Sequence, residues 1–229
     1  MLVKHRLNTR TLRYQLLEQH AAGPVPSIIV ASSPTRRVGR LAAEVPGDLV
    51  QMDCLHIGSF KETKLGRAKH SKGQIWQYTA IDVASSYTWA QLHTTPHNPD
   101  PAITSALAHQ VASDLTAWGW TWKAVTTDNG NEYRSGLFRD TIEGLGVEHR
   151  FIKAGRPQTN GKAERVQGTM IQELYQPALI GYTEPSITGL RRDLTNYLTY
   201  YNHHRRHYGR WNQGATPATI ITPNPKTKP

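Results

Sequence analysis

The sequence predicts an α/β domain, and two observations lead to this fold class. Three segments rich in β-branched and aromatic residues follow one another, as in an antiparallel meander. Helical and strand-like segments then alternate, as in strands joined by crossover helices. Together these patterns predict a mixed five-stranded sheet flanked by helices. The 229 residues suffice for one such domain with appendages.

The residues before the first strand are basic and divide into two segments. Residues 1–22 include a short helix over 8–20, with Asn8 as its cap and leucines on part of one face. We interpret this helix as a remnant of a helix-turn-helix module whose Arg10 and Arg13 contact DNA. A basic helix packed on the core is the alternative. Residues 23–47 are rich in proline and arginine, which predicts a basic linker.

The main domain is predicted over residues 48–222, and its strands come first. Five segments have the β-branched and aromatic content of strands: 49–57, 75–83, 87–93, 122–127 and 147–152. Between the first two, residues 59–73 contain five lysines and arginines and predict a basic loop or hairpin.

The helices of this domain are predicted from apolar residues spaced three and four apart. They cover residues 101–118, 135–145, 160–175 and 187–202, the last being the final helix. In the third helix Glu164 lies about 100° from the apolar Ala163, so it can face a cleft while the helix stays docked. Residues 223–229 are rich in proline and lysine, which predicts a disordered tail.

Charge and cysteine content narrow the classes of function. The net charge of +10 favours a polyanionic partner such as nucleic acid, because each neutralised phosphate releases counterions. Cys54 is the only cysteine, which excludes an intramolecular disulfide and a multi-cysteine zinc site. No apolar run approaches the ~18 residues of a membrane span. We therefore expect a soluble, intracellular protein without membrane contact.

Three carboxylates stand in distinctive settings. Asp53 lies within an apolar run, Asp128 ends another run just before a turn, and Glu164 lies in a predicted helix. Three acids on separate elements of a basic protein predict a site that holds divalent metal ions against a phosphodiester. Taken singly, Asp128 could be a turn residue and Glu164 a solvated helix charge. A further acid in an apolar strand, Asp82, is interpreted as structural and hydrogen-bonded near the strand end.

The element order and the three acids resemble the ribonuclease-H-like catalytic core of retroviral integrases and bacterial insertion-sequence transposases. The motifs that carry this resemblance are Met52-Asp53, Thr127-Asp128-Asn129-Gly130, the long stretch Gly155–Arg165, and Tyr200–His207 followed by Thr216-Pro217. The last two motifs look more like bacterial transposases than viral integrases. Residues 48–222 are thereby expected to form an integrase-type catalytic core.

The resemblance implies an aspartate-aspartate-glutamate recombinase, a polynucleotidyl transferase that cuts element ends and joins their 3′ hydroxyls to target DNA. Such enzymes use two Mg²⁺ ions, or Mn²⁺ as a substitute. By this resemblance Asp53 bridges the ions, Asp128 completes one and Glu164 the other. The implied partners are double-stranded DNA and further copies of the chain, in the bacterial cytoplasm at the nucleoid.

DNA contacts are expected from basic and polar residues beside the acids and after the last long helix, with ordinary helix-surface roles as the alternative. Besides Arg10 and Arg13, these residues are Lys153, Arg156, Asn160, Lys162, Arg165, Arg205 and Arg206. Two other functions remain open. One is a DNA-binding regulator derived from a shortened transposase, which the short N-terminal segment suggests. The other is a ribonuclease-H-like nuclease, which cleavage of an RNA–DNA hybrid would reveal.

Overall fold

The structure is a computed structural model that describes residues 43–59, 62–64, 67–69, 73–152, 160–181, 186–209 and 211–222. The predicted helix at 8–20 with Arg10 and Arg13, most of the predicted linker, and the predicted tail lie outside these residues. So do Lys153, Arg156 and most of the loop before Asn160. Within the described part, no helix is both long and apolar enough to cross a bilayer.

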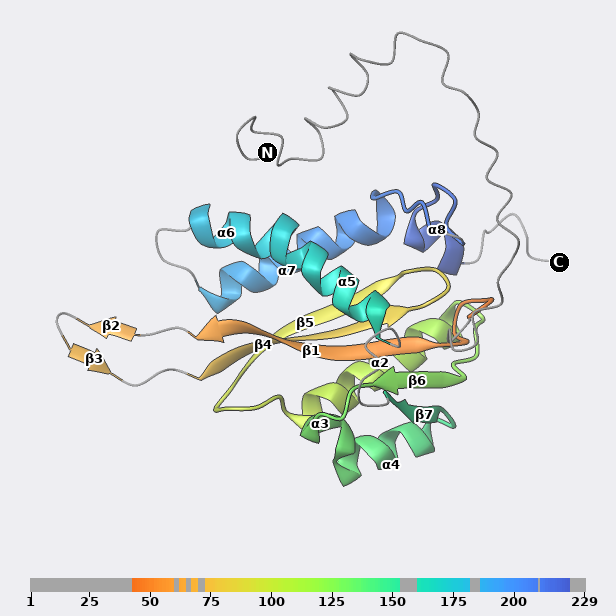
Figure 1. The fold of residues 1–229 in the computed structure, drawn as a ribbon, viewed down its shortest axis with the longest axis horizontal. Coiled ribbons are helices and arrows are strands. Elements are labelled where there is room, and N and C mark those ends of the chain that lie inside the picture. Colours follow the sequence, from red (N-terminus) through yellow and green to blue (C-terminus); the bar gives the residue numbers. More distant parts are fainter. Residues whose placement is uncertain are drawn as a thin grey trace, which may run out of the picture. The chain divides into compact units, whose positions relative to one another are not determined.

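A mixed five-stranded sheet forms the centre of the fold (Figure 1). Its strands lie in the order β5-β4-β1-β6-β7, with β1 antiparallel to β4 and parallel to β6. The bounds are β1 Val50–Ser59, β4 Gln74–Asp82, β5 Thr88–Thr95, β6 Ala124–Thr127 and β7 Glu148–Phe151. The prediction of a mixed five-stranded sheet is thus confirmed. Between β1 and β4, two short strands pair as a hairpin: β2 Glu62–Lys64 and β3 Arg67–Lys69.

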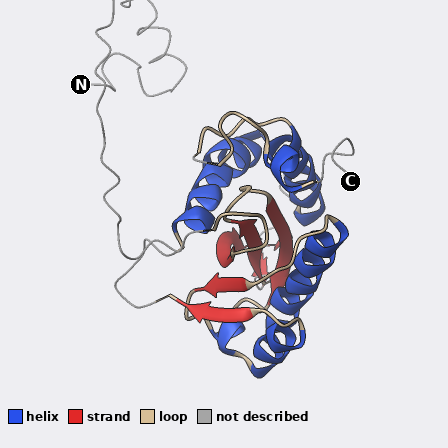
Figure 2. Cartoon of the chain, turned by 90° about the vertical axis from the view of Figure 1, so that its right-hand side faces the viewer, coloured by secondary structure: helices blue, strands red, loops and turns tan. Residues whose placement is uncertain are grey.

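Helices cover both faces of the sheet (Figures 1 and 2). On one face lie α2 Pro101–Ala117, α3 Asn131–Arg134 and α4 Gly136–Gly144. On the other lie α5 Gly161–Met170, the π-helical turn η2 Ile171–Tyr175, α6 Gln176–Gly181 and α7 Ile187–His203. The short helix α8 Pro217–Ile221 packs against α7.

Each face of the sheet has its own hydrophobic core, because side chains alternate along a strand. On β1, Val50 and Met52 belong to the core under α2 and α4. The intervening Gln51 and the next residue on its side, Asp53, therefore face the side covered by α5. That second core contains Ala163, Val166 and Met170 of α5 together with residues of α7.

The helices differ from the predictions in three places. The third helix was predicted to end at Tyr175, but the helical segment continues to Gly181. The π-helical turn η2 precedes Pro177 and lets the helix continue past it. In this turn the Gln176 N–H donates to the Ile171 carbonyl five residues back, which is the wider spacing of a π-helix. The helical chain therefore continues through Pro177 without a break. The helices α3 and α8 were also missed, since each spans too few residues to show an apolar period.

Candidate active site

The pairing of β1 with β6 brings the first two predicted acids to the place where β6 ends. The two strands are parallel, with Val50 opposite Val125 and Gln51 opposite Thr126. Two more residues in the same register place Asp53 level with Asp128, where β6 has ended. The strand order therefore joins two acids that are far apart in the sequence.

Asp128 is held by the turn that follows β6. Its Oδ1 atom accepts a hydrogen bond from the Gly130 amide at 3.0 Å, which is the local bond expected of an aspartate in a turn. The side-chain amide of Asn129 donates to the Ile152 carbonyl at 3.0 Å and ties this turn to the end of β7. Asp128 can therefore both stabilise this turn and bind a metal ion together with Asp53.

Glu164 lies in the first turn of α5, the helix that covers the Asp53 side of β1. The next-door Ala163 is fully buried in the core under this helix, whereas Glu164 is exposed. The Oε1 atom of Gln51, two residues before Asp53, accepts hydrogen bonds from the amides of Lys162 at 3.0 Å and Ala163 at 3.2 Å. The first turn of α5 is therefore attached to the strand that carries Asp53.

Burial and neighbouring negative charges both raise the pKa of Asp53. Burial is the largest cause that raises its pKa, from 3.8 to about 7, and the neighbouring charge of Asp128 is the next. Glu164 and Glu132 add to the rise, while a hydrogen bond of 3.0 Å from the Cys54 amide opposes it. A negative field from three carboxylates thus acts on Asp53.

Glu132 is the residue of this site that the sequence analysis missed. Its side chain is only 7% exposed, and burial followed by the charge of Asp128 raises its pKa. It lies in α3 beside Cys54, whose thiol is 3.4 Å from the Tyr133 hydroxyl. The available signal was an acid four residues after Asp128, just beyond the turn.

The donor atoms of the three predicted acids suit a hard divalent cation. Asp53, Asp128 and Glu164 offer carboxylate oxygens, the ligands that Mg²⁺ prefers, and their mutual repulsion is what a cation would relieve. Among the residues that the structure describes, no three His, Cys, Asp or Glu side chains gather at metal-binding spacing. The three carboxylates therefore suit a divalent cation in their charge and in their donor atoms.

Asp82 lies apart from these acids, as predicted. It is fully buried, and its carboxylate accepts hydrogen bonds from the Gly47 amide at 2.9 Å and from both the amide and the hydroxyl of Ser85 at 2.6 Å. Burial raises its pKa, whereas these bonds and the nearby charge of Lys162 oppose the rise. The interpretation of Asp82 as a hydrogen-bonded structural acid is confirmed.

Two of the residues predicted to contact DNA have buried surroundings. Asn160 is 2% exposed, and within the described part of the chain its Oδ1 atom has no hydrogen-bond partner. The Lys162 ammonium donates to the Val83 carbonyl and, at 3.0 Å, to the Ser86 hydroxyl. Burial lowers the pKa of Lys162. The structure thus gives Lys162 an intramolecular role, and its contact with DNA stays a prediction.

The arginines predicted to contact DNA lie in more open positions. Arg165 and Arg206 are exposed. The Arg205 guanidinium is 2.8 Å from a Glu173 carboxylate oxygen and lies 5.4 Å from the centre of the Tyr201 ring. Part of the charge of Arg205 is therefore engaged within the protein, and contacts of all three with DNA remain predictions.

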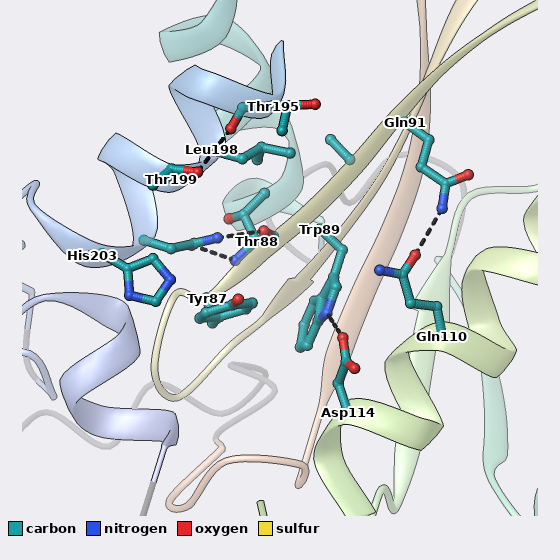
Figure 3. Close-up of a pocket in the computed structure, with 12 residues that line it drawn as sticks. Tyr87, Thr88, Trp89, Gln91, Gln110, Asp114, Thr195, Leu198, Thr199 and His203 are labelled. Atoms are coloured by element: carbon teal, nitrogen blue, oxygen red, sulfur yellow. Dashed lines mark hydrogen bonds between the residues drawn. The ribbon is translucent and has the colours of Figure 1, made fainter. Parts of the chain in front are cut away.

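A pocket of about 240 Å³ lies elsewhere, between β5, α2 and α7 (Figure 3). Trp89 donates to the Asp114 carboxylate at 2.8 Å, and Asn202 bonds both the amide and the carbonyl of Thr88. As far as the structure describes its lining, Asp53, Asp128 and Glu164 are not part of it. We therefore place the candidate site at these three acids and not in this pocket.

The raised pKa of Asp53 predicts that Asp53→Asn stabilises the metal-free protein at high pH. Because the pKa is raised on folding, the contribution of Asp53 to stability is full below its unfolded value of 3.8 and is lost as pH rises through about 7. An asparagine does not ionise. We expect Asp53→Asn to raise the free energy of unfolding by roughly 2–3 kcal/mol more at pH 8 than at pH 5.

Urea unfolding with a chelator at both pH values measures this difference. The exposed Asp140→Asn is the control, and it should change stability by less than about 0.5 kcal/mol at either pH. An equal effect of Asp53→Asn at pH 5 and pH 8 would contradict the raised pKa.

The chain matches two descriptions of the integrase core domain, one over residues 43–157 and the other over residues 145–213. The first match alone spans more than half of the 229 residues. No curated protein sequence matches the chain.

Similar solved structures are viral integrases. A chain of the simian T-cell lymphotropic virus intasome, in complex with PP2A regulatory subunit B56 gamma, is similar with a TM-score of 0.61 and 19% identity over 83% of this chain. The present chain spans only 59% of that intasome chain. The HTLV-2 integrase catalytic core domain in complex with magnesium is similar in its trimeric form, with a TM-score of 0.56 and 18% identity over 79% of this chain and 99% of that one. Its dimeric form gives 0.54 and 18% over 77% and 97%. At these identities the likeness concerns the fold.

Proposed function

Because this chain belongs to the integrase core domain family, we propose that it is a DNA transposase that cuts element ends and joins their 3′ hydroxyls to target DNA. One observation carries the proposal beyond the family. Asp53, Asp128 and Glu164 come from separate elements, and the charges of the other two act on Asp53. Such a concentration of negative charge in a protein of net charge +10 suits a metal-dependent reaction on a polyanion.

The three carboxylates would have distinct tasks in this reaction. Asp53, held by β1, Asp128, held by its turn, and Glu164, held by α5, would ligate Mg²⁺ or Mn²⁺ through oxygen atoms. When bound, such ions lower the pKa of an attacking water or hydroxyl and stabilise the leaving oxygen of an in-line displacement. The carboxylates would form no covalent bond to the substrate.

Several features support DNA and further copies of the chain as partners. The net charge is +10, and the exposed Arg165 follows Glu164 directly. The similar viral structures include an intasome and dimeric and trimeric forms of a catalytic core. Joining two element ends in concert requires more than one active site, so we propose that the chain acts as a homo-oligomer on double-stranded DNA.

A strand-transfer assay tests this function. DNA ends taken from beside the gene are incubated with a supercoiled plasmid target and Mg²⁺, Mn²⁺ or chelator. We expect metal-dependent joining by the wild type. Asp128→Asn should reduce the joining rate by roughly 1,000-fold, because losing a metal ligand removes several kcal/mol of transition-state stabilisation.

The same assay separates the two alternatives. Binding of DNA without joining at any metal concentration would identify a regulator. Cleavage of an RNA–DNA hybrid without joining would identify a nuclease. Asp140→Asn removes an exposed carboxylate in the middle of α4, and this variant should join DNA at the wild-type rate.

A further inference from the structure

Among the described residues, the residue just before α5 does not cap the first turn of this helix with its side chain. A helix begins with amide N–H groups that have no partner within the helix, and a polar side chain just before the helix normally accepts from them. Asn160 occupies that position but, among the described residues, makes no side-chain cap hydrogen bond. Its carbonyl accepts the amide of Glu164, at 3.1 Å, which begins the helical bonding.

Gln51 supplies the missing cap from the neighbouring strand. Its Oε1 atom accepts from both Lys162, at 3.0 Å, and Ala163, at 3.2 Å, although 111 and 112 positions separate these residues from Gln51 in the chain. The Gln51 side chain is 5% exposed, so these bonds are shielded from water. A bond that is shielded in this way holds the helix end in one place.

Each residue of this contact lies close in the sequence to an acid of the proposed site. Gln51 is two residues before Asp53, and Ala163 is one residue before Glu164. Gln51 lies on the same side of β1 as Asp53, because residues two apart in a strand share a face. At the other end Ala163, which donates to Gln51, is followed directly by Glu164. The Gln51 contact therefore connects the strand of Asp53 directly to the helix of Glu164.

We propose that Gln51 is a positioning residue, which holds Glu164 beside Asp53 by capping α5 from β1. The inference rests on the proposed function, since it names what sets the geometry of that same site. Gln51 does not touch the substrate. It acts on the reaction through Glu164, and a displacement of about 1 Å at such a group can reduce a rate by up to ~100-fold.

The test compares three variants at matched positions. Gln51→Met keeps the length of the side chain but removes the acceptor, and Gln51→Glu restores an acceptor oxygen at a helix N-terminus, where a negative charge is favourable. The control is Gln77→Met, in the neighbouring strand. Gln77 is likewise fully buried, but it contacts Met170 and Tyr175 further along the same helical segment.

We expect Gln51→Met to lower the joining rate at saturating DNA by about tenfold while the affinity for DNA stays within twofold. Gln51→Glu should recover at least a third of the wild-type rate. Gln77→Met should lose stability but keep a rate within threefold of wild type. A Gln51→Met rate within twofold of wild type, or an equal loss in Gln77→Met, would overturn the inference.

Two measurements without DNA keep this inference separate from the proposed function. In Gln51→Met the amides of Lys162 and Ala163 should exchange their hydrogens at least tenfold faster, while the β1 amides stay protected. The same variant should weaken Mn²⁺ binding, measured by electron paramagnetic resonance of free Mn²⁺, in the same direction as Glu164→Gln. If the wild type joins no DNA, the proposed function fails. Mn²⁺ binding that is unchanged in Gln51→Met but weakened in Glu164→Gln would overturn the positioning role instead.

Discussion

Glu164→Gln is expected to reduce strand transfer by at least ~1,000-fold while the protein stays folded and binds DNA. Glutamine has the shape of glutamate but is neutral, and a neutral amide is a poor ligand for Mg²⁺. The loss of several kcal/mol of transition-state stabilisation corresponds to a factor of this size. Glu164 is exposed at the start of α5, so its replacement leaves the core intact.

The control for this variant is Glu143→Gln, which removes the same charge from an exposed position in α4. Both variants change the net charge equally, so any general electrostatic effect on DNA binding is shared. The rate should therefore fall only in Glu164→Gln. Near-normal strand transfer by that variant, in single-turnover reactions with excess metal, would remove Glu164 from the catalytic set.

Asp82→Ala is expected to have the largest effect on stability, a loss of about 3 kcal/mol or more in the free energy of unfolding. The fully buried carboxylate accepts three hydrogen bonds, from Gly47 and Ser85. Alanine leaves these donors without a partner and removes a negative charge that acts on the half-buried Lys162 ammonium. Chemical denaturation at pH 7 measures the loss.

Two further variants serve as a partial replacement and as a control for Asp82→Ala. Asp82→Asn keeps one acceptor oxygen and should recover part of the lost stability. The exposed Asp140→Ala should change stability by less than about 0.5 kcal/mol. A loss of only 1 kcal/mol in Asp82→Ala would show that water enters and satisfies the freed donors.

The acids themselves could be predicted because their signals are local. Asp53 interrupts an apolar strand, and Asp128 stands where such a strand meets a turn. Asp82 was correctly separated from them, since a serine pair follows it in the turn and one of these serines, Ser85, donates to it. Glu132 was missed because nothing in a four-residue helix announces that its side chain folds back into a buried acidic site.

The sequence by itself determined the class of fold, the five strands, the long helices and the three candidate acids. These features are local to one segment. Side chains on one face repeat every two residues in a strand and every three to four residues in a helix. Only the tertiary structure decided that Asp53 lies level with Asp128 and that Gln51 caps the helix of Glu164. These contacts join residues that are more than 70 positions apart, and their partners depend on strand order and register, which no local pattern specifies.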